Sequence, residues 1–199
     1  LLSATLTLAS AQTEVELRSR KFSMGVQPTF SVNFPGAEKG DVEAWFKKAL
    51  KDISEDVRDK KEITATGARI PAATGDTLAI LLAVDQRSKN EDAVVHLAFR
   101  IQNVFVNSDS EERRIEGCRK FVYDQAVAYK KAVAAKRLES AERDLSGLRS
   151  NLEVMVRDQK RMEQGIEKNT QRSTDAGSDK ENAANDLKRA DERVNELQS

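Results

Sequence analysis

Apolar residues follow one seven-residue repeat through the C-terminal part of the chain, from Leu138 to Leu197. With Leu138 at position a of the heptad, the large apolar residues at a and d are Leu138, Leu145, Leu148, Leu152, Met155, Met162, Ile166, Leu187, Val194 and Leu197. We call these residues the apolar seam. Seven residues make two turns of a slightly underwound helix, so the seam runs along one side of a helix and needs a partner helix to cover it.

Two geometries fit this repeat. One continuous helix is favoured because Ile166 and Leu187 both occupy position a, three whole heptads apart, which a turn would not need to preserve. The other is a helical hairpin in which Gly177 ends one helix and Ser178 with Glu181 forms the capping box of the next.

Charged residues beside the seam bear on the partner. In a parallel, in-register homodimer, position g faces the following e of the other chain. This pairing gives one attractive contact, Asp144 with Arg149, and two repulsive contacts, Asp158 with Glu163 and Asp186 with Asp191. An antiparallel, higher-order or heterotypic partner is therefore at least as well supported as a parallel copy.

The preceding residues alternate between apolar and polar positions, which is typical of strands. Strands are predicted at residues 13–21, 30–34, 62–66, 77–84 and 93–106, with an amphipathic helix at 41–53 whose N-cap is Asp41. Residues 77–84 are apolar on both faces and predict a central strand, 93–106 predicts the longest strand, and the charged segment 52–61 predicts a loop. The order of two strands, a helix and three strands predicts an α+β fold with a small antiparallel sheet covered by helices.

A second helix is predicted to begin at a capping box made by Ser108 and Glu111. Its apolar side holds Ile115, Cys118, Val122, Ala126, Tyr129 and Val133. These positions do not coincide with the apolar seam, so we expect the helix to lie on the sheet as far as Val133 and then to leave the domain. The predicted organisation is a residual signal peptide at 1–11, an α+β head at 12–133 and a coiled-coil tail at 134–199.

The first residues read LLSATLTLASA and end in a small-x-small pattern that signal peptidase accepts. We interpret them as the remainder of a secretory signal cleaved before Gln12; a buried first strand is the alternative. No other apolar run approaches the ~20 residues of a membrane span. The protein is therefore expected to be periplasmic or secreted, without a membrane span. With Cys118 as its single cysteine, it has no internal disulfide.

The charges are balanced, with 33 Lys and Arg against 33 Asp and Glu, so no net field attracts nucleic acid. Residues 113–137 nevertheless carry eight basic and two acidic side chains. A solvated helix face explains this excess, and weak contact with an anionic polymer of the cell envelope is the functional hypothesis. No aromatic residues are interleaved on that side, which argues against nucleic-acid stacking.

The sequence predicts no catalytic residue, cofactor site or metal site. His96 is the only histidine, and without a second ligand it predicts a surface or hydrogen-bonded structural role. Cys118 falls on a core-facing helix side, and residues 36–40 lack the spacing of a phosphate loop. We therefore expect a protein that is not an enzyme.

The layout of signal, compact α+β head and charged helical tail resembles that of uncharacterised exported bacterial proteins. It resembles more distantly periplasmic holdase chaperones, which have a small body and helical arms. The leading hypothesis is a non-enzymatic interaction or scaffolding protein of the cell envelope that binds itself or a protein partner through the seam. The alternatives are a glycan- or lipid-binding head with the tail as a spacer, and a holdase-like chaperone.

Overall fold

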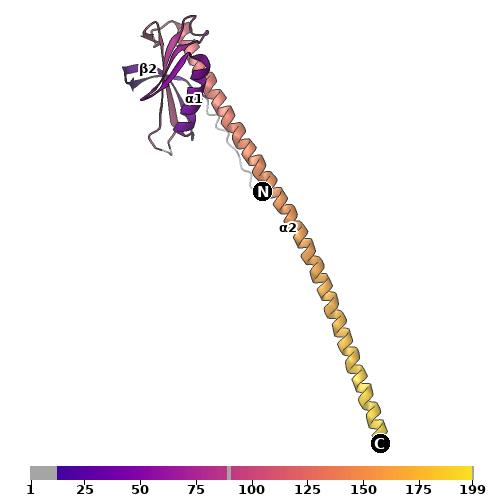
Figure 1. The fold of residues 1–199 in the computed structure, drawn as a ribbon. Helices are drawn as coiled ribbons and strands as arrows, with labels where there is room; N and C mark the ends of the chain where they lie inside the picture. The colour runs from indigo at the N-terminus through magenta and orange to yellow at the C-terminus, as the bar shows by residue number, and fades with distance from the viewer. Residues whose placement is uncertain (1–12, 89–90, 199) are drawn as a thin grey trace. The chain divides into compact units, whose positions relative to one another are not determined.

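The computed structural model describes residues 13–88 and 91–198 (Figure 1). The side chains of residues 191 and 194–198 are not described. The chain divides into two compact units, Leu1–Lys136 and Arg137–Ser199. We refer to them as the head and the tail. The proposed signal residues lie outside the described part of the chain. The predicted α+β fold is confirmed: the head holds an antiparallel sheet with a helix, and a long helix follows.

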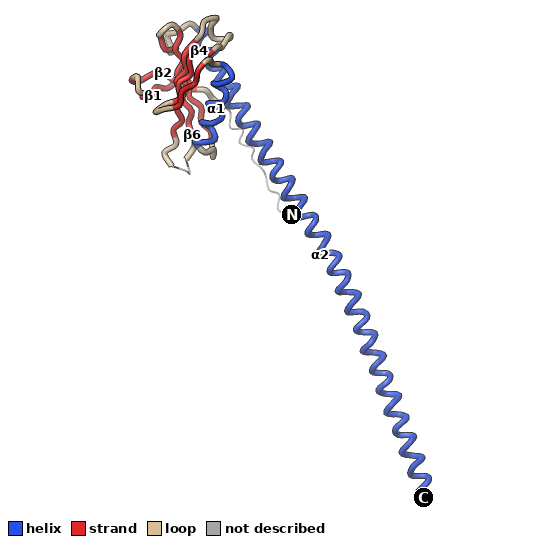
Figure 2. Tube along the Cα trace, in the orientation of Figure 1, coloured by secondary structure: helices blue, strands red, loops and turns tan. Residues whose placement is uncertain are grey.

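Within the described residues, the sheet has seven strands in the order β1-β2-β6-β5-β4-β3, with β7 paired to β6. Figure 2 shows the strands in red and the helices in blue. Their bounds are β1 (Glu16–Phe22), β2 (Gly25–Phe34), β3 (Asp56–Asp59), β4 (Ile63–Ala68), β5 (Leu78–Asp85), β6 (Ala93–Ile101) and β7 (Val104–Phe105). All neighbouring strands are antiparallel. β5 lies between β4 and β6, as its apolar sequence predicted.

Two strand predictions were wrong. Residues 52–61 contain β3, which pairs with β4 at the sheet edge even though its sequence is charged. The predicted strand 93–106 ends at Ile101, where Gln102 (φ 48°) and Asn103 (φ 67°) form a tight turn in the left-handed region, and β7 folds back on β6. Asparagine tolerates this backbone region better than most residues. The longest strand is consequently β2, with 10 residues.

The described residues form two helices, α1 (Lys39–Ile53) and α2 (Glu112–Gln198). The predicted N-cap Asp41 is wrong: α1 begins at Lys39, and Asp41 lies in its first turn. The N-cap is Glu38, whose side chain makes no capping hydrogen bond. α2 does not begin with the predicted capping box: Ser108 Oγ donates to Asp109 Oδ1 (3.3 Å), and the turn before the helix is closed on Asn107 Oδ1 by the Asp109 N–H. α2 continues unbroken through Gly177, so the hairpin alternative is wrong.

Both helices contribute to the main core of the head. α1 buries Val42, Phe46 and Leu50 completely. The predicted apolar side of α2 belongs to the same core, with Cys118, Val122, Ala126 and Tyr129 buried and Ile115 and Val133 partly buried. Phe34 joins the two helices to the sheet, because its ring meets Phe46 and Tyr129 edge-on at centroid distances of 5.8 and 5.2 Å.

The β1–β2 hairpin covers part of the other face of the sheet. β2 pairs with β6 only between Phe30 and Phe34, and its earlier residues pair with β1 alone. At the end of β1, Phe22 packs in a second apolar cluster with Leu81 of β5 and Ala98 of β6. The N–H of Ser23 donates to Glu62 Oε2 (2.9 Å), which fixes the tip of the hairpin beside β4.

Candidate functional site

The apolar seam is exposed along the tail. Its eight large side chains between Leu138 and Leu187 are each 48–68% exposed to solvent. Val194 and Leu197 belong to the side chains that are not described. Scattered apolar residues on a surface are ordinary, but a periodic apolar row on one side of a helix is the surface that a partner helix covers.

The seam lies on uninterrupted helix, so its residues keep a fixed spacing. At 1.5 Å per residue, Leu138 and Leu187 are about 74 Å apart along the axis. Gly147, Gly165 and Gly177 do not break the helix, and apart from the adjoining helix backbone no atom of the described residues lies within 4 Å of where their Cβ atoms would be. The seam can therefore contact a second helix over many turns.

The other sides of the tail are charged and paired locally. Arg161 contacts Asp158 at 3.6 Å and Arg189 contacts Asp186 at 3.8 Å, each one turn away on the same helix. Such exposed pairs stabilise a helix by only a few tenths of a kcal/mol, roughly 0.2–0.5. Val154 and Val156 are the large apolar side chains outside the seam that the described tail exposes.

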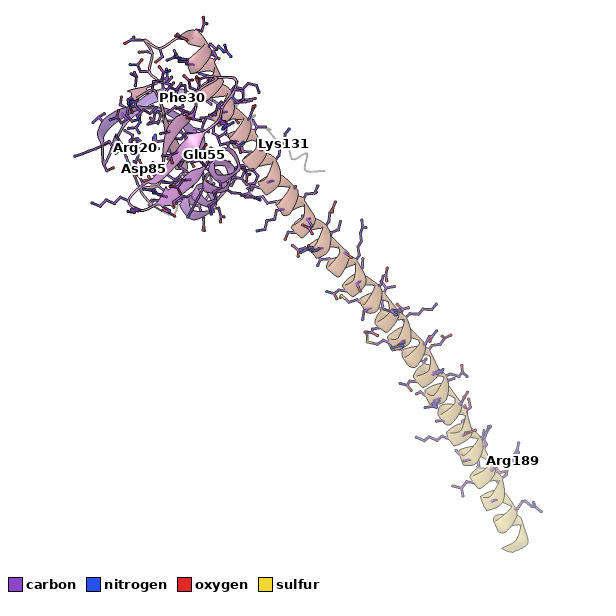
Figure 3. The ribbon with its side chains drawn as sticks, turned by 45° about the horizontal axis from the view of Figure 1, so that its top comes forward. Arg20, Phe30, Glu55, Asp85, Lys131 and Arg189 are labelled. Atoms are coloured by element: carbon purple, nitrogen blue, oxygen red, sulfur yellow. The ribbon has the colours of Figure 1, made fainter. Side chains whose placement is uncertain are left out.

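The head contains a chain of polar contacts that the sequence did not predict. Ser31 Oγ on β2 lies 2.8 Å from His96 Nδ1 on β6, and His96 Nε2 lies 3.4 Å from Asp85 Oδ2 on β5. The guanidinium of Arg20 on β1 donates to both oxygens of Asp85, at 2.6 and 2.8 Å. Figure 3 shows Arg20 and Asp85 next to each other.

The surroundings of His96, Asp85 and Arg20 shift the pKa values of these three side chains. Burial lowers the pKa of His96, against the opposing effect of Asp85. The hydrogen bonds from Arg20 lower the pKa of Asp85, and the same bonds raise the pKa of Arg20. At neutral pH, the imidazole of His96 is therefore neutral and lies beside the ion pair of Arg20 and Asp85.

Ser31, His96 and Asp85 are the residue types of a nucleophile, a base and a carboxylate, but their geometry favours a structural role. Ser31 is 2% exposed, and its hydroxyl is shared with Thr29 Oγ1 at 3.1 Å. A nucleophile must reach its substrate, and the carboxylate here is already occupied by Arg20. The hydrogen-bonded structural role predicted for His96 is what the described contacts give.

A shallow hollow lies beside Ser31 at the edge of the sheet. It encloses about 240 Å³ and is lined by Glu14, Glu16, Arg18, Ser31, Val32, Asn33, Pro35, Val94 and Lys130. Its two acidic and two basic side chains offer no net charge, and Glu16 is already paired with Arg18 at 2.6 Å. This lining selects no ligand class.

The remaining candidates are weak. Burial raises the pKa of Cys118 to about 12, so its thiol stays protonated at neutral pH. Within residues 13–88 and 91–198, no cluster of three metal-ligating side chains occurs, and no described helix is both long enough and apolar enough to cross a bilayer.

The basic side of α2 in the head is partly neutralised by its own neighbours. Arg114 contacts Glu111 at 3.3 Å, Lys120 contacts Asp124 at 2.7 Å, and Arg119 pairs with Glu116. Lys130 lies over the ring of Phe34, 5.9 Å from its centroid. Three of the eight basic side chains in residues 113–137 therefore have a carboxylate partner, so the basic excess is only partly neutralised.

No family model, curated protein or solved structure matches the chain. The apolar seam is accordingly the feature from which function can be inferred.

Proposed function

We propose that the protein is an exported, non-enzymatic interaction or scaffolding protein of the cell envelope, which binds another helix through its apolar seam. The observation that carries this proposal is the exposure of eight large seam side chains in register on one continuous helix. Full burial of one such side chain is favourable by roughly 1.5–3 kcal/mol. Several of them together exceed the cost of association, which is of order 10 kcal/mol.

The location in the envelope rests on the sequence of residues 1–11, with its small-x-small end. We propose a non-enzymatic role because Ser31 and Cys118, the two candidate nucleophiles considered above, are both buried and could not reach a substrate.

The head gives less support to the ligand-binding alternative. A pocket between the sheet and α1 would favour it, but Val42, Phe46 and Leu50 fill that interface without exposure. A holdase-like role would require the seam to bind unfolded chains rather than one helix, and the regular heptad spacing favours a helical partner.

The test is site-specific photocrosslinking in cells that make the protein. A photoreactive amino acid replaces Leu152 in the seam or, as a matched control, Val154 on the outer side of the same helical turn. We expect a product of one defined mass from position 152 and none from position 154. If both positions give no product, or give the same diffuse mixture, the seam does not bind a specific helix and the proposal fails.

A further inference from the structure

Two amides interrupt the seam and restrict how a partner can align with it. Gln159 occupies position a and Asn169 occupies position d, and both are exposed on α2. Gln159 Nε2 donates to Glu163 Oε1 (2.9 Å), which leaves its oxygen and its second N–H for another group. A polar residue inside a coiled-coil seam is costly against an apolar neighbour and specifies the register in which it meets a polar one.

The possible alignments of two antiparallel copies can be compared through these amides. In an antiparallel pair, each a position faces a d position of the other helix. The d positions other than Asn169 hold alanine, leucine or methionine. One antiparallel alignment therefore satisfies Gln159 with an amide, namely the one that places it opposite Asn169, and symmetry then repeats the same pair on the other side.

We propose that the seam is covered by the seam of a second copy of this chain, antiparallel, with Gln159 of each copy opposite Asn169 of the other. This inference rests on the proposed function and specifies its partner. Gln164 of each copy then lies level with itself, and the overlap extends from Leu138 to Ala190. That length is about 80 Å at 1.5 Å per residue.

Side-chain size supports the same alignment independently of the amides. Leucines of one copy face alanines of the other in four residue pairs, each of which occurs twice by symmetry: Leu138 with Ala190, Leu145 with Ala183, Leu152 with Ala176 and Leu187 with Ala141. Near the centre, Ile166 faces Met162. Pairing a large with a small residue in successive layers keeps the distance between the helices even and the packing dense.

A parallel, in-register pair is the strongest competing arrangement, because it also matches amide with amide. It places Lys180 of one copy against Lys180 of the other inside the seam, whereas the antiparallel alignment places Lys180 against Leu148, whose surface its aliphatic stem can cover. It also collects leucine layers at one end and alanine layers at the other, so the helices would have to converge.

The flanking charges do not separate the two arrangements. The antiparallel pair gains contacts between Asp158 and Arg172, but it brings Asp144 close to Asp186. The parallel pair likewise mixes attractive and repulsive contacts. The residues at positions a and d, rather than the flanking charges, therefore determine the orientation of the partner helix.

Disulfide crosslinking of the purified full chain tests the alignment. Leu145→Cys and Ala183→Cys are made singly and together, and Cys118 stays in place because it is buried. We expect the double variant, and an equimolar mixture of the two single variants, to form a covalent dimer upon oxidation, with a bridge between positions 145 and 183 identified by mass spectrometry. Each single variant alone, like the unmodified chain, should remain without a crosslinked dimer.

Other outcomes overturn the inference. A covalent dimer of Leu145→Cys alone would show the parallel arrangement. If no combination forms a dimer while photocrosslinking at position 152 yields a product with a different protein, the proposed function stands and the inference of a second copy fails. If neither experiment yields a product, both fail.

Discussion

At the scale of single residues, Gly117 determines how closely α2 approaches the loop before β5. A Cβ atom at this position would lie 2.4 Å from the backbone nitrogen and Cα of Ala73, and backbone atoms cannot move aside without shifting the loop. The sequence showed a helix glycine but not the close approach, because the loop that meets it is distant along the chain.

We predict that Gly117→Ala destabilises the head by about 1–3 kcal/mol, the usual cost of overpacking a tight contact. Gly147→Ala lies in the same helix, but no described atom beyond the adjoining helix backbone lies within 4 Å of its added Cβ; it serves as the control and should leave the stability of the head unchanged. Urea unfolding followed by the fluorescence of Trp45, the single tryptophan, measures the head alone. Equal unfolding midpoints for both variants would contradict the close packing.

His96 predicts a pH dependence of stability. Its pKa is lowered in the folded protein, so the folded state binds fewer protons than the unfolded state, whose histidine titrates near 6.5. Stability should be complete above about pH 6.5 and decrease as the pH falls from there toward the lower pKa of the folded state. Asp85, whose pKa is also lowered, adds a further loss only in stronger acid.

The variant His96→Gln isolates this effect, since glutamine keeps a hydrogen-bonding group but does not titrate. We expect the urea midpoint of the natural chain to decrease between pH 7.5 and 5.5 and that of the variant to stay nearly constant over the same range. Parallel slopes for the two proteins would assign the pH dependence to other groups. The partners of His96 could not be predicted, because Ser31 is 65 positions away along the chain and only the sheet register brings them together.

At the scale of elements, the apolar pattern predicted the sheet, α1 and α2. It failed for an exposed, charged strand and for a turn without glycine, because neither leaves a signal in the apolar pattern. β3 was missed because its Asp56, Arg58 and Asp59 leave no apolar alternation on an exposed edge. The end of β6 was missed because Gln102 and Asn103 adopt positive φ values without a glycine to signal the turn. The fold of the β1–β2 hairpin over the second sheet face depends on contacts between strands that sequence periodicity does not report.

That hairpin supplies a prediction of its own. Phe22 is 4% exposed and fills the second apolar cluster, so Phe22→Ala should destabilise the head by about 3 kcal/mol, as truncation of a buried aromatic residue usually does. Val26→Ala, on the same hairpin but 67% exposed, should change stability by less than ~0.5 kcal/mol. The unfolding midpoints of the two variants, measured by Trp45 fluorescence, provide the comparison. If they coincide, the hairpin is not held down through Phe22.

At the scale of the whole molecule, the heptad repeat predicted both the continuous helix and the seam residues that the tail exposes. It did not predict the partner, because a seam specifies that it must be covered and not by which helix. The additional information lies in the positions of Gln159, Asn169 and the alanines, which acquire meaning only when two helices are aligned.

Sedimentation velocity of the full chain over a series of concentrations tests the central claim most directly. We predict a species of twice the 22.1 kDa chain mass, which Leu145→Asp combined with Leu152→Asp converts to a monomer and which Val154→Asp leaves intact. A mass of 22.1 kDa at every concentration, or equal dissociation by the seam variant and the Val154 control, would contradict the claim that another copy covers the seam.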